Sequence, residues 1–139
     1  MIKIMEKDIV AGLGEIGLPI LKIISKKENV VGYDLNKKLM NEKKFHKFEN
    51  VPTSFLHIAI PVTKKFDSNL ISLFKKFRPK CMVIHSTIPP GTIENIQKKI
   101  DSPIIYSATR GVHKRMLKDI KRYTKFFVIS NNAQEKNGQ

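Results

Sequence analysis

The feature that most constrains this chain is a spaced set of glycines that directly follows a short apolar run. The run ends at Ala11, and the glycines after it have the spacing G-x-G-x-x-G: Gly12, Gly14 and Gly17. A second apolar run, residues 30–33, ends at Asp34. A strand, a glycine-rich turn, a helix and a second strand that ends in a carboxylate form the local arrangement that binds a dinucleotide.

Each part of this pattern has its own physical role. Gly12 permits a tight turn, Gly14 lets the backbone approach a pyrophosphate, and Gly17 lets the helix pack closely on the strand. The N–H groups and the positive dipole at the start of the helix favour phosphate charge. Asp34 is placed to accept hydrogen bonds from a ribose. The turn residues predicted to contact the cofactor are Gly12, Leu13, Gly14, Glu15, Ile16 and Gly17.

Apolar periodicity places further elements along the chain. Strands are expected at residues 7–11, 30–33, 55–60, 81–85, 103–106 and 125–129. Helices are expected at residues 14–27, 66–77, 93–100 and 114–121, with one irregular helix within residues 35–52. Strands that alternate with helices predict an α/β fold, a three-layer, doubly wound parallel sheet of the Rossmann type.

For this sheet we expect the strand order 3-2-1-4-5-6, in one domain formed by residues 1–130 and followed by a polar tail, residues 131–139. Ligands bind such sheets at the carboxyl ends of the strands, here at the switch between the first and fourth strands. The glycine turn and Asp34 would then meet the residues after the third and fourth strands, which are Ile60, Pro61, Ser86 and Thr87.

The chain is strongly basic, with 26 Lys and Arg residues, 12 Asp and Glu residues and a formal net charge of +14. Such a charge is compatible with nucleic acid, a membrane surface or acidic small molecules as partners. The lysines are spread through nearly every segment, which favours a solvated surface over a nucleic-acid site. The densest basic run, within residues 114–125, gives the alternative of an acidic or phosphate-bearing substrate.

Cysteine and hydropathy restrict the cellular setting. The only cysteine is Cys81, which cannot form an internal disulfide and lies in an apolar run typical of a buried thiol. No apolar stretch approaches the roughly 20 residues that cross a bilayer, and the first residues do not resemble a signal peptide. We therefore expect a cytoplasmic protein with no membrane partner. No Cys/His cluster has metal-ligand spacing, so no metal is predicted.

With these segments placed, the chain resembles the N-terminal domain of the nucleotide-sugar dehydrogenases, the group of UDP-glucose and UDP-N-acetylmannosamine dehydrogenases. It is similar, more distantly, to 6-phosphogluconate and prephenate dehydrogenases. The resemblance covers most of residues 8–107. The matching segments are residues 12–19 (GLGEIGLP), 32–36 (GYDLN), 60–62 (IPV) and 86–92 (STIPPGT).

This resemblance implies NAD as cofactor and oxidation of an alcohol carbon by hydride transfer. It implies that Asp34 and Asn36 hold the adenosine ribose and that Leu35, between them, is a further cofactor-binding residue. It also implies that Ile60 and Pro61 line the cofactor cleft and that Ser86 and Thr87 lie towards the nicotinamide. Asp34 also favours NAD over NADP, because a carboxylate repels a ribose phosphate.

The sequence departs from the family in its catalytic part. Where the family has Ser-Pro-Glu-Arg, this chain reads Ser-Ala-Thr-Arg at residues 107–110, so the acid of that motif is absent. The family's catalytic cysteine and lysine belong to later domains that have no counterpart here, and we expect a cofactor-binding domain without the substrate domain. The candidates for a catalytic role are Thr87, His85 and His113, with packing or a surface turn as the alternative for the two histidines.

Three functions therefore stay open. The first is the NAD-binding domain of a nucleotide-sugar-dehydrogenase-like oxidoreductase, which would need a homodimer partner or a separate catalytic subunit for its second wall. The second is a non-catalytic dinucleotide-binding module or regulatory subunit. The third is a basic protein associated with nucleic acid, whose binding would fall steeply with salt. The residues leave open whether the chain carries out turnover by itself.

Overall fold

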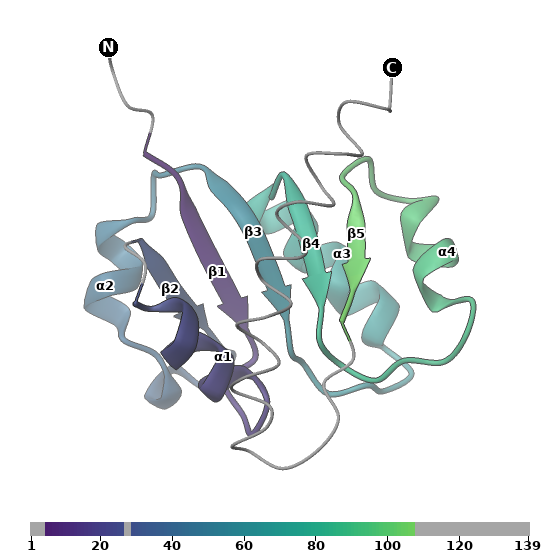
Figure 1. The fold of residues 1–139 in the computed structure, drawn as a ribbon, viewed down its shortest axis with the longest axis horizontal. Coiled ribbons are helices and arrows are strands. Elements are labelled where there is room, and N and C mark those ends of the chain that lie inside the picture. The colour runs from purple at the N-terminus through teal and green to yellow at the C-terminus, as the bar shows by residue number, and fades with distance from the viewer. Residues whose placement is uncertain (1–4, 27–28, 108–139) are drawn as a thin grey trace.

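The structure, a computed structural model, describes residues 5–26 and 29–107 and shows an α/β fold with helices on both faces of a parallel sheet (Figure 1). Its elements in chain order are β1 (Lys7–Ala11), α1 (Gly17–Ile24), β2 (Val30–Tyr33), the 3-10 helix η1 (Lys37–Leu39), α2 (Glu42–Lys47), β3 (Thr53–Ile58), α3 (Phe66–Phe77), β4 (Cys81–Ile84), α4 (Thr92–Gln97) and β5 (Ile104–Tyr106).

The described strands form one five-stranded sheet in the order β2-β1-β3-β4-β5, and all neighbouring pairs are parallel. β1 lies between β2 and β3, so that Val10 is opposite Gly32 on one side and opposite His57 on the other. Because every strand runs the same way, the carboxyl ends of all five meet at one edge of the sheet, which is the edge that holds the predicted site residues.

The predicted order 3-2-1-4-5-6 is wrong in the position of the third strand. β3 pairs with β1 and not with β2, and β2 is therefore an edge strand among the described residues. In this position β3 pairs along both of its edges, with β1 and with β4. It is also buried on both faces, with Leu56 and Ile58 fully buried on one face and His57 6% exposed on the other, as is typical of a parallel sheet that is covered on both sides. The point at which the strand order reverses accordingly lies between β1 and β3.

Two apolar cores cover the two faces of the sheet. Alternating residues of β1 separate them: Ile9 and Ala11 belong to the larger core, and Val10 belongs to the smaller. The larger core contains the buried side chains of α3 and α4, whereas the smaller packs α1 through Ile20 and Ile24. This three-layer arrangement fixes α1 against β1 and β2, and fixes α3 on the opposite face.

Several predicted elements differ in extent from the observed ones. α1 starts at Gly17 rather than at residue 14, because the intervening residues form the turn, and residues 35–52 contain η1 and α2 in place of one irregular helix. The predicted helix at 114–121, the sixth strand at 125–129 and the tail at 131–139 lie outside the described residues. No helix within 5–26 and 29–107 has the length and apolar character needed to cross a bilayer.

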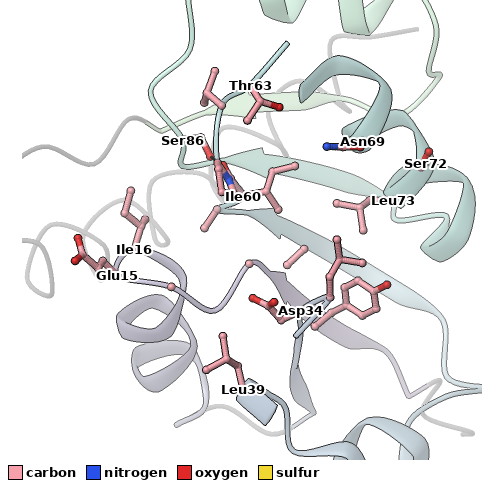
Figure 2. A pocket seen from close by; sticks show the side chains of 18 of the residues that line it. Glu15, Ile16, Asp34, Leu39, Ile60, Thr63, Asn69, Ser72, Leu73 and Ser86 are labelled. Atoms are coloured by element: carbon pink, nitrogen blue, oxygen red, sulfur yellow. Dashed lines mark hydrogen bonds between the residues drawn. The ribbon is translucent and has the colours of Figure 1, made fainter. Parts of the chain in front are cut away.

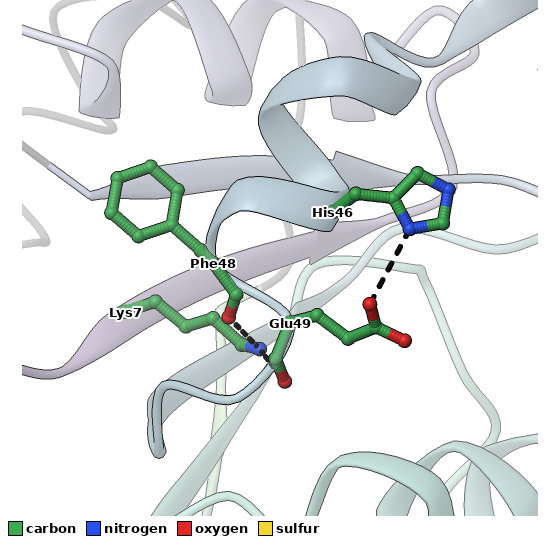
Figure 3. A network of polar contacts seen from close by, with 4 residues as sticks. All are labelled: Lys7, His46, Phe48 and Glu49. Atoms are coloured by element: carbon green, nitrogen blue, oxygen red, sulfur yellow. Dashed lines mark hydrogen bonds and ion pairs between the residues drawn. The ribbon is translucent and has the colours of Figure 1, made fainter.

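At the edge of the sheet opposite the site, a buried lysine joins β1 to the end of α2 (Figure 3). Lys7 is 4% exposed, and its Nζ donates to the carbonyl oxygens of Phe48 at 2.7 Å and of Glu49 at 3.3 Å. Burial lowers the pKa of Lys7, while the Glu49 charge acts in the opposite direction. The ammonium satisfies carbonyl groups after the last turn of α2, where a cation is also favoured by the helix dipole.

We expect Lys7→Met to lower the free energy of unfolding by about 1.5–3 kcal/mol, because it leaves the Phe48 carbonyl without its charged donor. Urea denaturation followed by circular dichroism measures this change. Lys43→Met, on the exposed surface of α2, is the matched control and should change stability by no more than about 0.5 kcal/mol. Equal stability of the two variants would contradict the role of Lys7.

Candidate functional site

A cavity of about 930 Å³ lies at the carboxyl ends of the strands, where β1 and β3 are neighbours (Figure 2). Its walls come from the glycine turn, the segment after β2, the segment after β3, the exposed side of α3 and the segment after β4. This volume is at the upper end of the range typical of cofactor pockets. Its position agrees with the general rule that ligands bind parallel α/β sheets at a switch in strand order.

The glycine turn depends on two close backbone approaches. A Cβ atom added to Gly17 would lie 1.5 Å from the carbonyl oxygen of Gly12. Gly12 has a φ of +94°, and a Cβ there would lie 2.6 Å from the carbonyl oxygen of Ala59. No side chain can be accommodated at either position without moving backbone, so these two glycines let α1 and the segment after β3 pack against the turn.

Gly14 has a different environment, because a Cβ added there would meet no atom within 4 Å. Gly14, Glu15 and Ile16 line the cavity immediately before α1. The start of α1 has no side-chain cap at Ile16 and no acidic residue in its first turn. The N–H groups and positive dipole at this end of α1 therefore adjoin the cavity and favour an anion there.

Asp34 joins the glycine turn to the segment after β2. Its Oδ2 accepts a hydrogen bond from the Leu13 N–H at 2.8 Å, and its Oδ1 accepts one from the Asn36 N–H at 2.8 Å. Each carboxylate oxygen can accept a second hydrogen bond. The carboxylate thus holds the turn in place and keeps acceptor capacity on the wall of the cavity.

The segments after β3 and β4 are also joined by a hydrogen bond. The buried Ser86 hydroxyl donates to the Ile60 carbonyl at 2.7 Å. Both residues line the cavity, as do the exposed Pro61 and Thr87. This bond fixes the spacing between the two segments. Because the Ser86 hydroxyl proton is used in it, the Ser86 oxygen can act only as an acceptor towards a ligand.

Most of the predicted cofactor-binding residues therefore meet at one cavity, and three do not line it. Leu13 is buried in the smaller core and takes part through its backbone N–H, and Gly17 acts by close packing beneath the turn. Asn36 caps η1, because its side-chain oxygen accepts from the Lys38 N–H at 3.2 Å. Leu35 lines the cavity and is 91% exposed.

One wall of the cavity, formed by α3, is not among the predicted site residues. Asn69, Ser72 and Leu73 project towards the cavity from the side opposite Asp34 and Leu39, as Figure 2 shows. Lys76, one turn beyond Ser72, lines the same wall. Additional lining residues are Ala11, Tyr33, Ala59, Val62 and Thr63. Asn69, Ser72 and Lys76 have the spacing i, i+3 and i+7, which predicts a polar face beside the apolar stripe of α3. The sequence does not tell which neighbouring segment this face meets.

His85 is not among the residues that line the cavity, and it pairs instead with a second buried histidine. The His57 Nδ1 and the His85 Nε2 are 2.9 Å apart, and the two side chains belong to residues that are 6% and 4% exposed. Burial lowers the pKa of His57 to about 4, and burial together with repulsion from His57 lowers the pKa of His85 well below 6.5. Both rings are therefore neutral at pH 7, with one ring donating to the other. This arrangement favours the packing alternative for His85, and His113 lies outside the described residues.

Within 5–26 and 29–107, no group of three or more His, Cys, Asp or Glu residues is arranged to hold a metal ion. Cys81 is buried in β4. No family model, curated protein or solved structure matches this chain. The site is therefore interpreted from its own geometry, and the relation to nucleotide-sugar dehydrogenases stays a prediction.

The histidine pair predicts a loss of stability in acid. The unfolded chain takes up a proton on His57 near pH 6.5, whereas the folded chain does so only near pH 4. As the pH falls between these values, protons bind preferentially to the unfolded state, and His57 alone should lower the free energy of unfolding by about 3 kcal/mol. Urea denaturation at a series of pH values measures this slope.

The matched variant is His57→Leu/His85→Leu, which removes both titrating rings and leaves no unpaired partner. We expect its stability to depend less on pH between 6.5 and 4 than that of the original chain. The same slope in both proteins would show that the pair does not titrate in this way.

Proposed function

We propose that this chain binds an adenine dinucleotide, NAD, across the carboxyl edge of its sheet. The observation that carries the proposal is the joint arrangement of the glycine turn, the uncapped start of α1 and Asp34 around one cavity. The pyrophosphate occupies the open space in front of Gly14. The adenosine ribose lies against Asp34, whose oxygens retain acceptor capacity for its hydroxyls.

The apolar part of the cavity supports the same placement. Leu39 comes from one side, Leu73 comes from α3 on the other, and Asp34 lies between them (Figure 2). Leu35, which follows Asp34 directly, also lines the cavity. An adenine ring presents two apolar faces and fits between such side chains. The nicotinamide half then extends past Ile60 towards Ser86 and Thr87. The sheet is, on this proposal, a doubly wound Rossmann-type sheet with a single strand, β2, on the outer side of β1.

We further propose that the dinucleotide serves a dehydrogenase of the nucleotide-sugar type, with hydride transfer from a substrate alcohol to NAD. The support for this finer assignment is the sequence of the four cavity segments, above all STIPPGT at residues 86–92. The protein acts in the cytoplasm, and a phosphate-bearing substrate suits its high positive charge.

Gly14→Val tests the position of the pyrophosphate. A Cβ added at Gly14 meets no atom within 4 Å and Gly14 lines the cavity, so the fold should be retained while the affinity for NAD⁺ and for ADP-ribose falls by about tenfold or more. Calorimetric titration measures the affinities, and thermal unfolding measures the fold. Gly14→Ala should give an intermediate loss.

Asn95→Val, on the exposed surface of α4, is the control for introducing a β-branched residue outside the cavity. It should leave both affinities unchanged. An unaltered affinity in a folded Gly14→Val variant would contradict the site.

One observation favours a second candidate, a cofactor-binding module that does not carry out the chemical step. The described residues that line the cavity include no histidine or cysteine, and their ionisable side chains are Glu15, Tyr33, Asp34 and Lys76. A general base near the nicotinamide must reach the substrate hydroxyl. Among the described lining residues, the polar side chains at that end are the hydroxyls of Thr63, Ser86 and Thr87 (Figure 2).

The two candidates differ in turnover. We expect the chain to bind NAD⁺ but to form no NADH, measured by fluorescence, when it is supplied alone with UDP-sugars and sugar phosphates. NADH formation by the isolated chain would establish the enzyme and exclude the module.

A further inference from the structure

Lys76 is the only basic side chain among the described residues that line the cavity. Its Nζ donates to the Tyr33 hydroxyl at 3.3 Å and lies 4.7 Å from the centroid of the Tyr33 ring. The Tyr33 ring is itself held edge-on by Phe77, at 5.1 Å between centroids, and packs against Phe45 at 5.8 Å. The ammonium therefore lies beside the end of β2, where a cation–π contact supports it.

This cation forms no ion pair with any carboxylate of the described residues. Asp34, which follows Tyr33 directly, accepts hydrogen bonds from two backbone N–H groups instead. A lysine that lines a cavity without a carboxylate partner keeps its charge available for a ligand. The ribose end of the cavity thus has one carboxylate that is already hydrogen-bonded and one cation that is not ion-paired.

The rim at this end adds further positive charge. Lys37 and Lys38 are exposed in η1, and Leu35 and Leu39 on either side of them both line the cavity. The carboxylate of Asp34 repels a ribose phosphate, but Lys76 lines the same cavity and the exposed Lys37 and Lys38 follow Asp34 closely in the chain, so that positive charge lies near this end. Phosphate oxygens are favourable partners for such ammonium groups.

We infer that the ribose end of this cavity is a phosphate site, so that the chain accepts an adenosine whose ribose carries a phosphate, and that Lys76 is the residue that recognises it. The inference rests on the proposed dinucleotide site and extends its ligands from NAD to those with a 2′- or 3′-phosphate on the adenosine. Lys76 donates to the phosphate oxygens from the α3 wall, opposite Asp34.

The test uses small probes that differ only at the ribose: 5′-AMP, adenosine 2′,5′-bisphosphate and adenosine 3′,5′-bisphosphate. In calorimetric titrations of the full chain, we expect one of the two bisphosphates to bind about tenfold more tightly than 5′-AMP. The preferred isomer identifies the phosphate position, and the preference should shrink as salt is raised. A parallel titration with NAD⁺ and NADP⁺ extends the result to dinucleotides.

Lys76→Met should remove most of this preference, measured as the ratio of the bisphosphate affinity to the 5′-AMP affinity of the same variant, and Lys76→Arg should retain it. Lys75→Met is the matched control, because Lys75 is exposed on the same helix and does not line the cavity. Thermal unfolding checks that all the variants are folded.

The outcomes separate this inference from the proposed function. If 5′-AMP and NAD⁺ bind but neither bisphosphate binds more tightly than 5′-AMP, the phosphate site is excluded and the dinucleotide site stands. If a bisphosphate is preferred and Lys76→Met keeps the preference, the role of Lys76 is excluded. If none of the nucleotides binds, the proposed function itself fails.

Discussion

The site depends on how closely the backbone of the turn after β1 approaches its neighbours. With Gly17 beneath the Gly12 carbonyl and Gly12 against Ala59, α1 starts directly at the edge of the sheet. Any larger residue at these positions would push the helix away from the strand ends. The anion-favouring end of α1 would then no longer adjoin the cavity. The need for glycine at positions 12 and 17 therefore determines where the start of α1, which favours an anion, lies relative to the cavity.

Two hydrogen bonds extend this arrangement across the sheet edge. The bond between the Leu13 N–H and Asp34 joins the first and second strands, and the bond between Ser86 and the Ile60 carbonyl joins the third and fourth. Each bond uses a side chain at a strand end to fix the segment that follows the neighbouring strand. The cavity lies between these two fixed halves, at the β1–β3 boundary, and α3 provides its remaining wall. A ligand that spans both halves would meet preformed surfaces and lose little binding energy to reorganisation.

The local parts of this site could be predicted from sequence, because their causes are local. Glycine spacing predicts where the backbone makes a tight turn or a close approach. A carboxylate at the end of an apolar run predicts a polar side chain at the carboxyl end of a strand. The strand order could not be predicted in the same way, because it depends on which strand edges pair across long separations in the chain. The residues from Phe55 to Ile60, apolar except for His57, are compatible with any strand of a sheet that is covered on both faces.

Contacts between distant elements were the hardest to predict. Lys76 and Tyr33 are 43 positions apart, and their contact depends on the placement of α3 across the sheet. The pairing of His57 with His85 depends on the register of β3 and β4, in which His57 is opposite Val83. A sequence shows two isolated histidines in two apolar runs. The register places the two rings 2.9 Å apart, and this pairing favours packing over a catalytic role for His85.

The most direct test of the account is a map of backbone amide shifts on addition of ADP-ribose, measured by nuclear magnetic resonance on the labelled chain. The account predicts the largest shifts at the amides of Gly14, Glu15 and Ile16 and at Leu35, with little change at Lys7 and Phe48 on the opposite edge of the sheet. Saturable shifts confined to other surfaces, or no shifts at millimolar ligand, would contradict the claim that this turn binds a diphosphate.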